Sequence, residues 1–357
     1  MANHLLTFAK QLIAIRSTAD NPKATRQALQ LCLSMLKNDF TVEWFEDHGV
    51  PSVLVHNRKK GHRRFDMILN GHLDVVPGKE EQYSPRVVGD RLYGCGSMDM
   101  KANVTCLVTV FDELAKQVDY ALALQLVGDE EVGGFHGTKH QVDCGVRAGF
   151  VLAGEPTNFD IVYKAKGILK ATVSAQGVSA HGAYPWRGKN AIWSMHDMLT
   201  SLRKAFPIPK KEVWETTLNL ARIETTNTWF NKIPDDCTAS VDIRFVAEEK
   251  KLALQRLKSV LSKDMRLTVL AQEPALDTDR KDPSVVALSK AAKQVTKKRI
   301  VLRGANGTSD ARHFARVGGS GVEFGPIGGD IGGPKEWVSI SSLDTYCEIL
   351  RAFLLAQ

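Results

Sequence analysis

The sequence predicts an α/β protein with two domains, and three observations support this fold class. The chain has 357 residues, whereas a single hydrophobic core stops growing near about 250–300 residues. Strand-like and helix-like runs alternate up to Gly154, which is typical of a sheet flanked by helices. Beyond Lys166 the runs follow the order β-α-β-β-α-β, which is the order of a ferredoxin-like domain.

The first part of the chain contains the runs expected to build the sheet and its helices. Residues 1–15 show an amphipathic helix pattern, interrupted by Lys10 and Gln11. Apolar residues recur at helical spacing in two further segments, and short apolar runs mark the strands. These elements are helices over Ala24–Leu36 and Ala102–Leu114, and strands over Thr41–Phe45, Ser52–His56, Phe65–Leu69, Ala121–Val127 and Phe150–Ala153.

Acidic residues and one histidine follow several of these apolar runs. His72 and Asp74 fall just beyond the carboxyl end of Phe65–Leu69, where open α/β sheets bind their ligands. Asp99 lies on a second turn that we also expect after a strand-like run, near the start of the helix from Ala102. Two later runs repeat the pattern and end at Asp129, Glu130, Glu131 and Glu155.

This set of side chains predicts a metal site. Carboxylates crowded at one edge of a sheet repel one another unless a cation holds them. A mixture of imidazole and carboxylate ligands suits zinc-type divalent ions in hydrolytic sites. The set therefore favours a metal site over the alternative that His72 beside Asp74 has no function. Cys95 is close to Asp99 in the chain, but the oxygen-rich surroundings argue against a thiolate ligand.

The motifs GHLDVVP, GCGSMDMKAN, GDEEVGG and GEP resemble, in order and separation, those of a known family. It is the metallo-aminoacylase and peptidase family that includes succinyl-diaminopimelate desuccinylase, acetylornithine deacetylase and glutamate carboxypeptidase. The resemblance implies a zinc-peptidase-like catalytic domain with a mixed sheet flanked by helices. It also implies one or two Zn²⁺ ions per chain, with Co²⁺ or Mn²⁺ as alternatives.

The resemblance also assigns roles to the strand-end residues. One metal would be bound by His72, Asp99 and Glu155, and Asp99 would bridge to a second metal shared with Glu131. Asp74 would orient His72 from behind, as is usual for a ligating imidazole. The remaining carboxylate, Glu130, would be the general base.

The second domain is expected to be an insertion. Residues 167–276 contain the ferredoxin-like run, and residues 1–166 and 277–357 together make a discontinuous metal-binding catalytic domain. The family resemblance implies that the insertion is a lid and dimerisation domain. The expected elements are strands Gly167–Ala175, Thr217–Ile223, Cys237–Phe245 and Leu267–Ala271, and helices Asn190–Phe206, Lys250–Asp264, Pro283–Val295 and Ser342–Leu355.

Several residues outside the metal cluster resemble substrate-contacting positions of the family. His181 in GVSAHGAYP would hydrogen-bond the oxyanion of the tetrahedral intermediate, in dimers often from the partner subunit; its alternative is a surface histidine without a role. Asn231 and Arg244 resemble lid positions that contact substrate, or are an ordinary loop amide and surface charge. The turn GTSDARHF resembles a carboxylate-binding turn through Thr308, Ser309 and Arg312.

One position departs from the family pattern. The last metal ligand of the family is a histidine shortly after Gly-Pro and a few residues before a Glu, but Gly332 stands there in GPIGGDIGGPKEWVSI. Three readings stay open at this vacant ligand position. Asp330 replaces the histidine, the site holds a single metal, or Gly332 is a deliberate substitution.

Charge and composition limit the other function classes. The net charge is +7, but the basic clusters are short, scattered and not interleaved with aromatic residues, so we expect no nucleic-acid partner. A modest positive field would steer anionic substrates instead. We expect no signal peptide and no membrane span. The six cysteines contain no CxxC pair, and we expect a cytoplasmic protein with reduced thiols.

The resulting functional hypothesis is a metal-dependent hydrolase that cleaves the amide bond of an N-acyl amino acid or a short peptide. The metals would polarise the scissile carbonyl and lower the pKa of a bridging water toward roughly 7, and Glu130 would take its proton. Alternatives are a dipeptidase or carboxypeptidase of the same family, or a weak or inactive ligand-binding homologue. We also expect a homodimer through the inserted domain, because its edge strand and the apolar positions of Asn190–Phe206 have no evident partner in their own chain.

Overall fold

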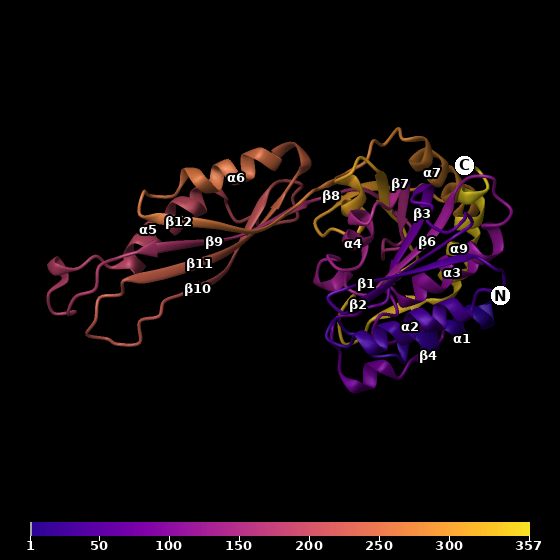
Figure 1. The fold of residues 1–357 in the computed structure, drawn as a ribbon, viewed down its shortest axis with the longest axis horizontal. Helices are drawn as coiled ribbons and strands as arrows, with labels where there is room; N and C mark the ends of the chain where they lie inside the picture. The colour runs from indigo at the N-terminus through magenta and orange to yellow at the C-terminus, as the bar shows by residue number, and fades with distance from the viewer. Residues whose placement is uncertain (1) are drawn as a thin grey trace. The chain divides into compact units, whose positions relative to one another are not determined.

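The computed structural model describes residues 2–357 and divides the chain into two compact units. The catalytic unit comprises Met1–Lys164, Asp277–Ala305 and Ser309–Gln357. The inserted unit comprises Ala165–Leu276 with Asn306–Thr308. In Figure 1 the catalytic unit contains both the indigo start and the yellow end of the chain. Its sequence is therefore interrupted by the inserted unit.

A mixed sheet forms the centre of the catalytic unit. Among the described residues it has nine strands, in the order β1-β2-β6-β3-β7-β15-β8-β13, with β14 pairing β8 off this path. The bounds are β1 Thr41–Asp47, β2 Val50–His56, β3 Arg64–His72, β6 Leu122–Val127, β7 Arg147–Ala153, β8 Ile161–Ala165, β13 Leu276–Asp277, β14 Leu302–Ala305 and β15 Ser320–Glu323.

The middle of this sheet is parallel. Strands β6, β3, β7 and β15 run in the same direction, and their residues are largely buried on both faces. Parallel strands are buried in this way because the helices that connect them cover both faces of the sheet. The register pairs His72 with Val127 and Glu323 with Ala153. The carboxyl ends of four strands therefore meet at one edge of the sheet.

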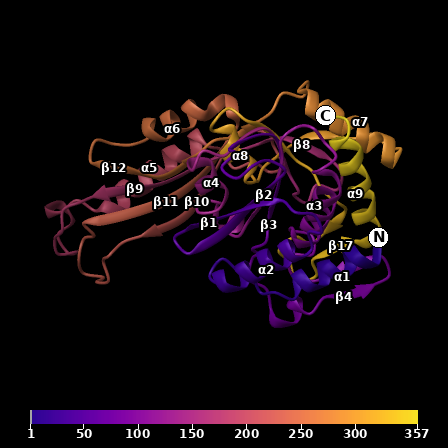
Figure 2. The same ribbon diagram turned by 45° about the vertical axis from the view of Figure 1, so that its right-hand side comes forward.

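Helices cover both faces of the sheet. One face carries the large apolar core, with Phe111 and Leu69 fully buried in it; Figure 2 shows α1, α3 and α9 gathered on that side. The other face carries two short helices that contact β1, β7 and β15. The first group is α1 Ala2–Ile13, α2 Pro22–Ser34, α3 Lys101–Leu114, α7 Pro283–Thr296 and α9 Ile340–Leu354, and the second is α4 Thr138–Asp143 and α8 Ala311–Ala315. The expected helix over residues 1–15 begins at Met1, which lies outside the described residues.

A small four-stranded sheet joins the two strands before the α3 helix to two strands near residues 328–339. Its order is β16-β17-β5-β4, with bounds β4 Arg86–Val88, β5 Arg91–Tyr93, β16 Gly328–Gly329 and β17 Trp337–Ser339. The turn that carries Asp99 follows β5 and leads into α3. The Asp99 turn therefore follows a strand, as expected, but this strand belongs to the small sheet and not to the main sheet.

The inserted unit has the predicted β-α-β-β-α-β order. Its antiparallel sheet has the strand order β10-β11-β9-β12, and its core is separate from that of the catalytic unit. The bounds are β9 Gly167–Gln176, α5 Ala191–Ala205, β10 Thr217–Glu224, β11 Asp236–Phe245, α6 Lys250–Ser259 and β12 Met265–Glu273. The α6 helix ends earlier than the expected Asp264.

The α5 helix does have a partner within its own chain. Its side chains Met195, Met198 and Leu202 are buried against the sheet of the inserted unit. The argument that the apolar positions of Asn190–Phe206 lack a partner is therefore wrong for this face. Trp193 remains exposed on another face of the helix, with 66% of its surface accessible.

Candidate metal centre and catalytic site

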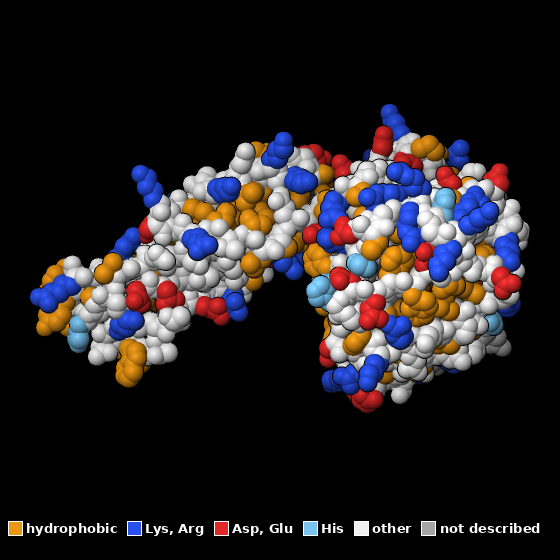
Figure 3. Space-filling model, viewed as in Figure 1, with side chains coloured by type: hydrophobic (Ala, Val, Ile, Leu, Met, Phe, Trp, Pro, Cys, Tyr) orange, Lys and Arg blue, Asp and Glu red, His pale blue; other side chains and the backbone are white. Residues whose placement is uncertain are grey.

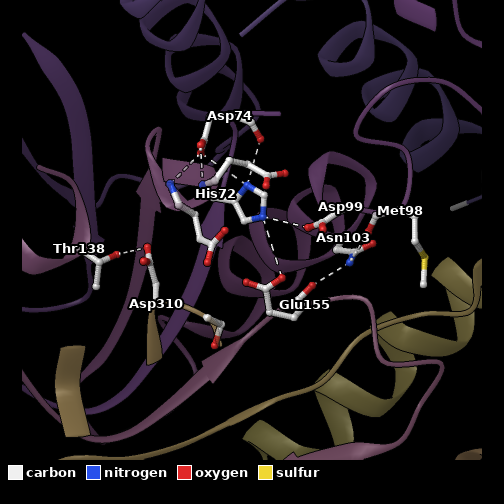
Figure 4. A network of polar contacts seen from close by, with 12 residues as sticks. His72, Asp74, Met98, Asp99, Asn103, Thr138, Glu155 and Asp310 are labelled. Carbon is white, nitrogen blue, oxygen red and sulfur yellow. Dashed lines mark hydrogen bonds and ion pairs between the residues drawn. The ribbon is translucent and has the colours of Figure 1, made fainter. Parts of the chain in front are cut away.

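His72 is the centre of the cluster at the edge of the sheet. Its ring is buried at the end of β3, and Nδ1 donates to the main-chain oxygen of Asp74 at 3.0 Å. Nε2 faces Asp99 Oδ1 at 3.0 Å and Glu155 Oε2 at 3.9 Å. Figure 4 shows both carboxylates converging on this nitrogen. Because Nδ1 is engaged as a donor, Nε2 is the nitrogen that a metal would use.

Asp74 ties the two following glutamates to the histidine. Its buried carboxylate accepts the backbone N–H of Glu130 at 3.2 Å and that of Glu131 at 2.9 Å. The same carboxylate lies 3.5 Å from His72 Nδ1. Asp74 therefore fixes the short 3₁₀ turn Glu130–Val132 relative to the imidazole.

Glu336 holds the Asp99 turn, and sequence reasoning did not single it out. Its buried carboxylate accepts three backbone N–H groups, from Gly96 at 3.1 Å, Met98 at 2.7 Å and Asp99 at 3.0 Å. Asn103 fastens the same turn to the end of β7 by donating to the main-chain oxygen of Gly154 at 2.7 Å. The only sequence signal for Glu336 is its place in the family-like run after Gly332.

Burial raises the pKa of the clustered carboxyl groups. Desolvation is the main cause for Glu130, Glu131 and Glu155, and the negative charge of Asp99 adds to it, while a charged His72 opposes it. The pKa of Glu131 is raised to about 7. Burial would lower the pKa of His72, but its hydrogen bonds to carboxylates raise it well above the ordinary value. The site therefore favours bound positive charge.

The donor set fits a divalent cation. His72, Asp99 and Glu131 each offer one ligand atom, and these atoms lie within 4.8 Å of one another. Glu155 adds a buried Oε1 that has no hydrogen-bond partner among the described residues. An unpartnered carboxylate oxygen is costly to bury unless a cation or a proton neutralises it. Imidazole with carboxylates is also the donor set of hydrolytic zinc-type sites.

Two further acidic residues border the cluster and were missed from the sequence. Asp310 is fully buried and accepts the hydroxyl of Thr138 at 2.6 Å. Glu323 ends β15, and burial raises its pKa to about 7. The apolar run before Glu323 repeats the strand-end pattern, so this residue was accessible to the same reasoning. Asp310 follows no such run, but it stands in GTSDARHF between Ser309 and Arg312.

Comparison with known proteins now identifies the family. Residues 68–356 match the family described as Peptidase family M20/M25/M40. The chain belongs to this family. The recognition of the family, the fold class and the assignment as a metal-dependent amidohydrolase are thereby confirmed.

Relatives and solved structures agree with this membership. Succinyl-diaminopimelate desuccinylase from Pelagibacter ubique is 27% identical, over 98% of each chain. Aminopeptidase PepT from Bacillus cereus has a TM-score of 0.80 at 20% identity and covers 100% of this chain and 98% of its own. The Bacillus subtilis YXEP protein, a dinuclear metal binding peptidase from the M20 family, has a TM-score of 0.71 at 12% identity. The match covers 99% of this chain and 97% of the YXEP chain.

In the inserted unit of this M20 enzyme, two residues predicted to contact substrate, His181 and Asn231, lie on neighbouring loops. The backbone N–H of Gly182 donates to the main-chain oxygen of Asn231 at 2.7 Å, next to the exposed His181. His181 Nδ1 accepts the N–H of Ala183 at 3.1 Å, which places the ring proton of neutral His181 on Nε2. Arg244 lies elsewhere on β11, where Nε donates to Asp242 at 2.9 Å.

The turn that resembles a carboxylate-binding segment points partly inward. Arg312 is 1% exposed, and its guanidinium donates to the main-chain oxygens of Ser309 at 2.7 Å and Gly133 at 2.6 Å. These bonds direct Arg312 to the protein backbone, in contrast to the expected bidentate contact with a substrate carboxylate. The hydroxyl of Thr308 is buried and has no hydrogen-bond partner among the described residues. The buried Ser309 faces the carboxyl group of Glu323 and opposes the rise in its pKa that burial causes.

The vacant ligand position lies on an exposed turn. Gly332 has a φ of 65°, and an added Cβ would meet nothing within 4 Å. Asp330 accepts the backbone N–H of Lys335 at 2.7 Å and so closes its own turn. Among the described residues, the ligand clusters of three or more groups do not include Asp330. These contacts do not support Asp330 as the replacement ligand.

We predict that Glu336→Gln weakens both the fold and the metal centre. The amide offers one acceptor oxygen instead of two, so at least one buried N–H loses its partner, at about 1–3 kcal/mol of unfolding free energy. Metal affinity should fall by about 10–100-fold, as for other residues that support a ligand. Urea unfolding and metal titration measure both effects. The matched variant Glu113→Gln, which removes a partly buried carboxylate paired with Arg351 between α3 and α9, should leave metal affinity unchanged.

Proposed function

We propose that this M20 enzyme hydrolyses the amide bond of an N-acyl amino acid or a short peptide. The observation that carries the proposal is the cluster of His72, Asp99 and Glu131 beside the uncommitted carboxylate of Glu130. The desuccinylase name of the Pelagibacter relative supports an N-acyl amino acid as substrate. A dipeptide or carboxy-terminal peptide bond is the second candidate, because solved structures with this fold include a metallo-carboxypeptidase and dipeptidases.

The residues that would hold the proposed Zn²⁺ are His72, Asp99, Glu131 and Glu155, and Asp99 would serve both ions if two are bound. Bound divalent cations supply Lewis-acid chemistry, because they polarise a carbonyl and lower the pKa of nearby water. The donor set supports this assignment. Asp74 keeps the imidazole and the Glu130–Val132 turn in place through its hydrogen bonds.

The proposed chemistry needs one base and one oxyanion donor. Glu130 accepts the proton of the attacking water and passes it to the leaving amine as the C–N bond breaks. His181 donates a hydrogen bond from Nε2 to the oxyanion, a role supported by the Ala183 N–H that occupies Nδ1. Asn231, beside the His181 loop, and Arg244 are the proposed lid contacts, and Thr308 with Ser309 the proposed carboxylate turn. We propose that Arg312 stabilises that turn through its hydrogen bond to the main-chain oxygen of Ser309.

The inserted unit is proposed to be the lid and dimerisation domain. Four aromatic side chains on it have high exposed fractions, which is unusual unless another surface covers them. These are Trp186 at 74%, Trp193 at 66%, Trp229 at 69% and Phe230 at 107%. The edge strand β10 is also mostly exposed and offers unpaired backbone groups to a second copy.

The proposed location is the cytoplasm. All six cysteines are free in the described chain, and five of them are buried, which agrees with a reducing compartment. As a separate finding, the described residues contain no helix that is long and apolar enough to cross a bilayer.

We predict that Glu130→Gln abolishes turnover but keeps the bound metal. The amide preserves the shape of the side chain but cannot accept a proton, so hydrolysis should fall by at least about 10²–10⁴-fold. Elemental analysis and hydrolysis of N-succinyl-diaminopimelate, N-acetylornithine and dipeptides measure the two quantities. The matched variant Glu131→Gln should lose metal as well. If Glu130→Gln loses metal and Glu131→Gln keeps it, the roles of the two glutamates are exchanged.

We predict that the chain forms a homodimer at micromolar concentration. Light scattering should give twice the chain mass of 39.4 kDa. Trp193→Glu places a charge on the exposed face of α5 and should shift the mass toward the monomer. The control Val88→Glu changes a 58% exposed apolar residue of the catalytic unit and should not. A wild-type protein of monomeric mass would reject the dimer and any role of His181 across subunits.

We predict that Gly332→His raises the affinity for a second metal ion and the hydrolysis rate together. Even residues that only support a ligand change metal affinity by about 10–100-fold, so an added imidazole should give at least about tenfold. The control Gly332→Ala carries the same left-handed backbone cost, about 1–3 kcal/mol, without the ring. If Gly332→His matches Gly332→Ala in metal content and rate, Gly332 is not the vacant ligand position.

A further inference from the structure

A histidine stands in the tight turn between β1 and β2. The two turn residues, His48 and Gly49, both have left-handed φ values, 48° and 78°. Such two-residue hairpin turns favour Asn-Gly or Gly-Gly. The backbone of the turn therefore gives no reason to prefer histidine over asparagine.

The ring of His48 belongs to a cluster of metal-ligating side chains. Its Nδ1 lies 2.9 Å from Asp47 Oδ1, and His136 Nδ1 lies 2.8 Å from Asp47 Oδ2. One ligand atom from each of the three residues lies within 4.8 Å of the others. A fourth candidate, His140, has Nδ1 3.9 Å from Asp47 Oδ2, and its Nε2 lies 3.6 Å from the Sγ of Cys144.

The cluster is open to solvent and separate from the metal centre at the end of β3. The exposed side-chain fractions are 74% for His48, 37% for His136 and 31% for Asp47. Figure 3 shows histidine side chains on this face of the catalytic unit, over the region where Figure 1 labels α4 and β1. Tetrahedral ligands at about 2.0–2.2 Å from an ion are about 3.3–3.6 Å apart. The two nitrogen–oxygen contacts go to different oxygens of Asp47, and one ligand atom from each residue lies within 4.8 Å of the others, so small side-chain rotations can bring the three atoms to that spacing.

We propose that Asp47, His48 and His136 form a second metal site, on the surface, for a borderline divalent transition-metal ion such as Zn²⁺, with His140 as a fourth ligand. Imidazole nitrogen selects Zn²⁺, Cu²⁺ or Ni²⁺ over Mg²⁺ and Ca²⁺, which prefer all-oxygen sites. This site is independent of the proposed hydrolysis, because it uses none of the ligands at the sheet edge.

A bound ion would join two segments that are far apart in the sequence. The hairpin contributes Asp47 and His48, and the loop before α4 contributes His136. The backbone N–H of His136 donates to Asp129 Oδ2 at 2.7 Å, and Asp129 directly precedes Glu130. The ion would therefore restrain the loop that carries the two catalytic-site glutamates at its other end.

The test is to count Zn²⁺ ions by elemental analysis after dialysis against graded free Zn²⁺. His48→Asn keeps a residue that tolerates the left-handed turn but removes the ring, and His136→Ala removes the second nitrogen. Each variant should bind one ion fewer per chain than the wild type. The matched control His196→Ala removes an exposed histidine whose Nδ1 also lies near a carboxylate, 3.4 Å from Asp197, and should bind as many ions as the wild type.

A His72→Ala background separates the surface site from the metal centre. In that background, the protein with His48 should still bind one Zn²⁺ more than the protein with His48→Asn. Mg²⁺ should not fill the surface site when it is supplied in place of Zn²⁺. The proposal is overturned if His48→Asn and His136→Ala bind as many ions as the wild type, or if the difference disappears in the His72→Ala background.

Discussion

The structure depends on the parallel packing of β6, β3, β7 and β15, because this packing brings their carboxyl ends together. Each of these strand ends delivers acidic side chains to one edge, and β3 also delivers His72. Burial raises the pKa of Glu130, Glu131, Glu155 and Glu323. The fold thus assembles groups that repel one another when ionised, and a bound cation is the natural partner for such a set.

Two carboxylates that are not proposed as ligands hold the backbone around these groups in place. Asp74 accepts N–H groups from the Glu130 and Glu131 positions, and Glu336 accepts those of Gly96, Met98 and Asp99. Charged acceptors make stronger hydrogen bonds to backbone N–H than neutral ones do. The turns that carry the proposed ligands are therefore ordered by the protein itself, which would lower the reorganisation needed when a metal or substrate binds.

Local sequence predicted the parts of the site that depend on local structure. The acidic residues after β3, β6 and β7 were predictable because a strand-like run fixes where its end lies. Glu336 was not, because its partner Asp99 lies 237 positions away in the chain. The resemblance of GTSDARHF to a carboxylate-binding turn did not predict the direction of Arg312, which depends on packing against the Gly133 loop. The α5 helix likewise needed the tertiary structure to show which face its own sheet covers.

The Gly133 loop explains why the segment after Glu131 is glycine-rich. Gly133 and Gly134 have φ values of 114° and 62°, and their N–H groups donate to the main-chain oxygens of Glu130 and Asp129, both at 2.7 Å. A Cβ on Gly134 would collide with the carboxylate of the buried Asp310. The loop is thus closed by its own backbone on one side and held by Arg312 on the other. Its position, and with it that of Glu130, depends on residues from the end of the chain as well as on the strand that precedes it.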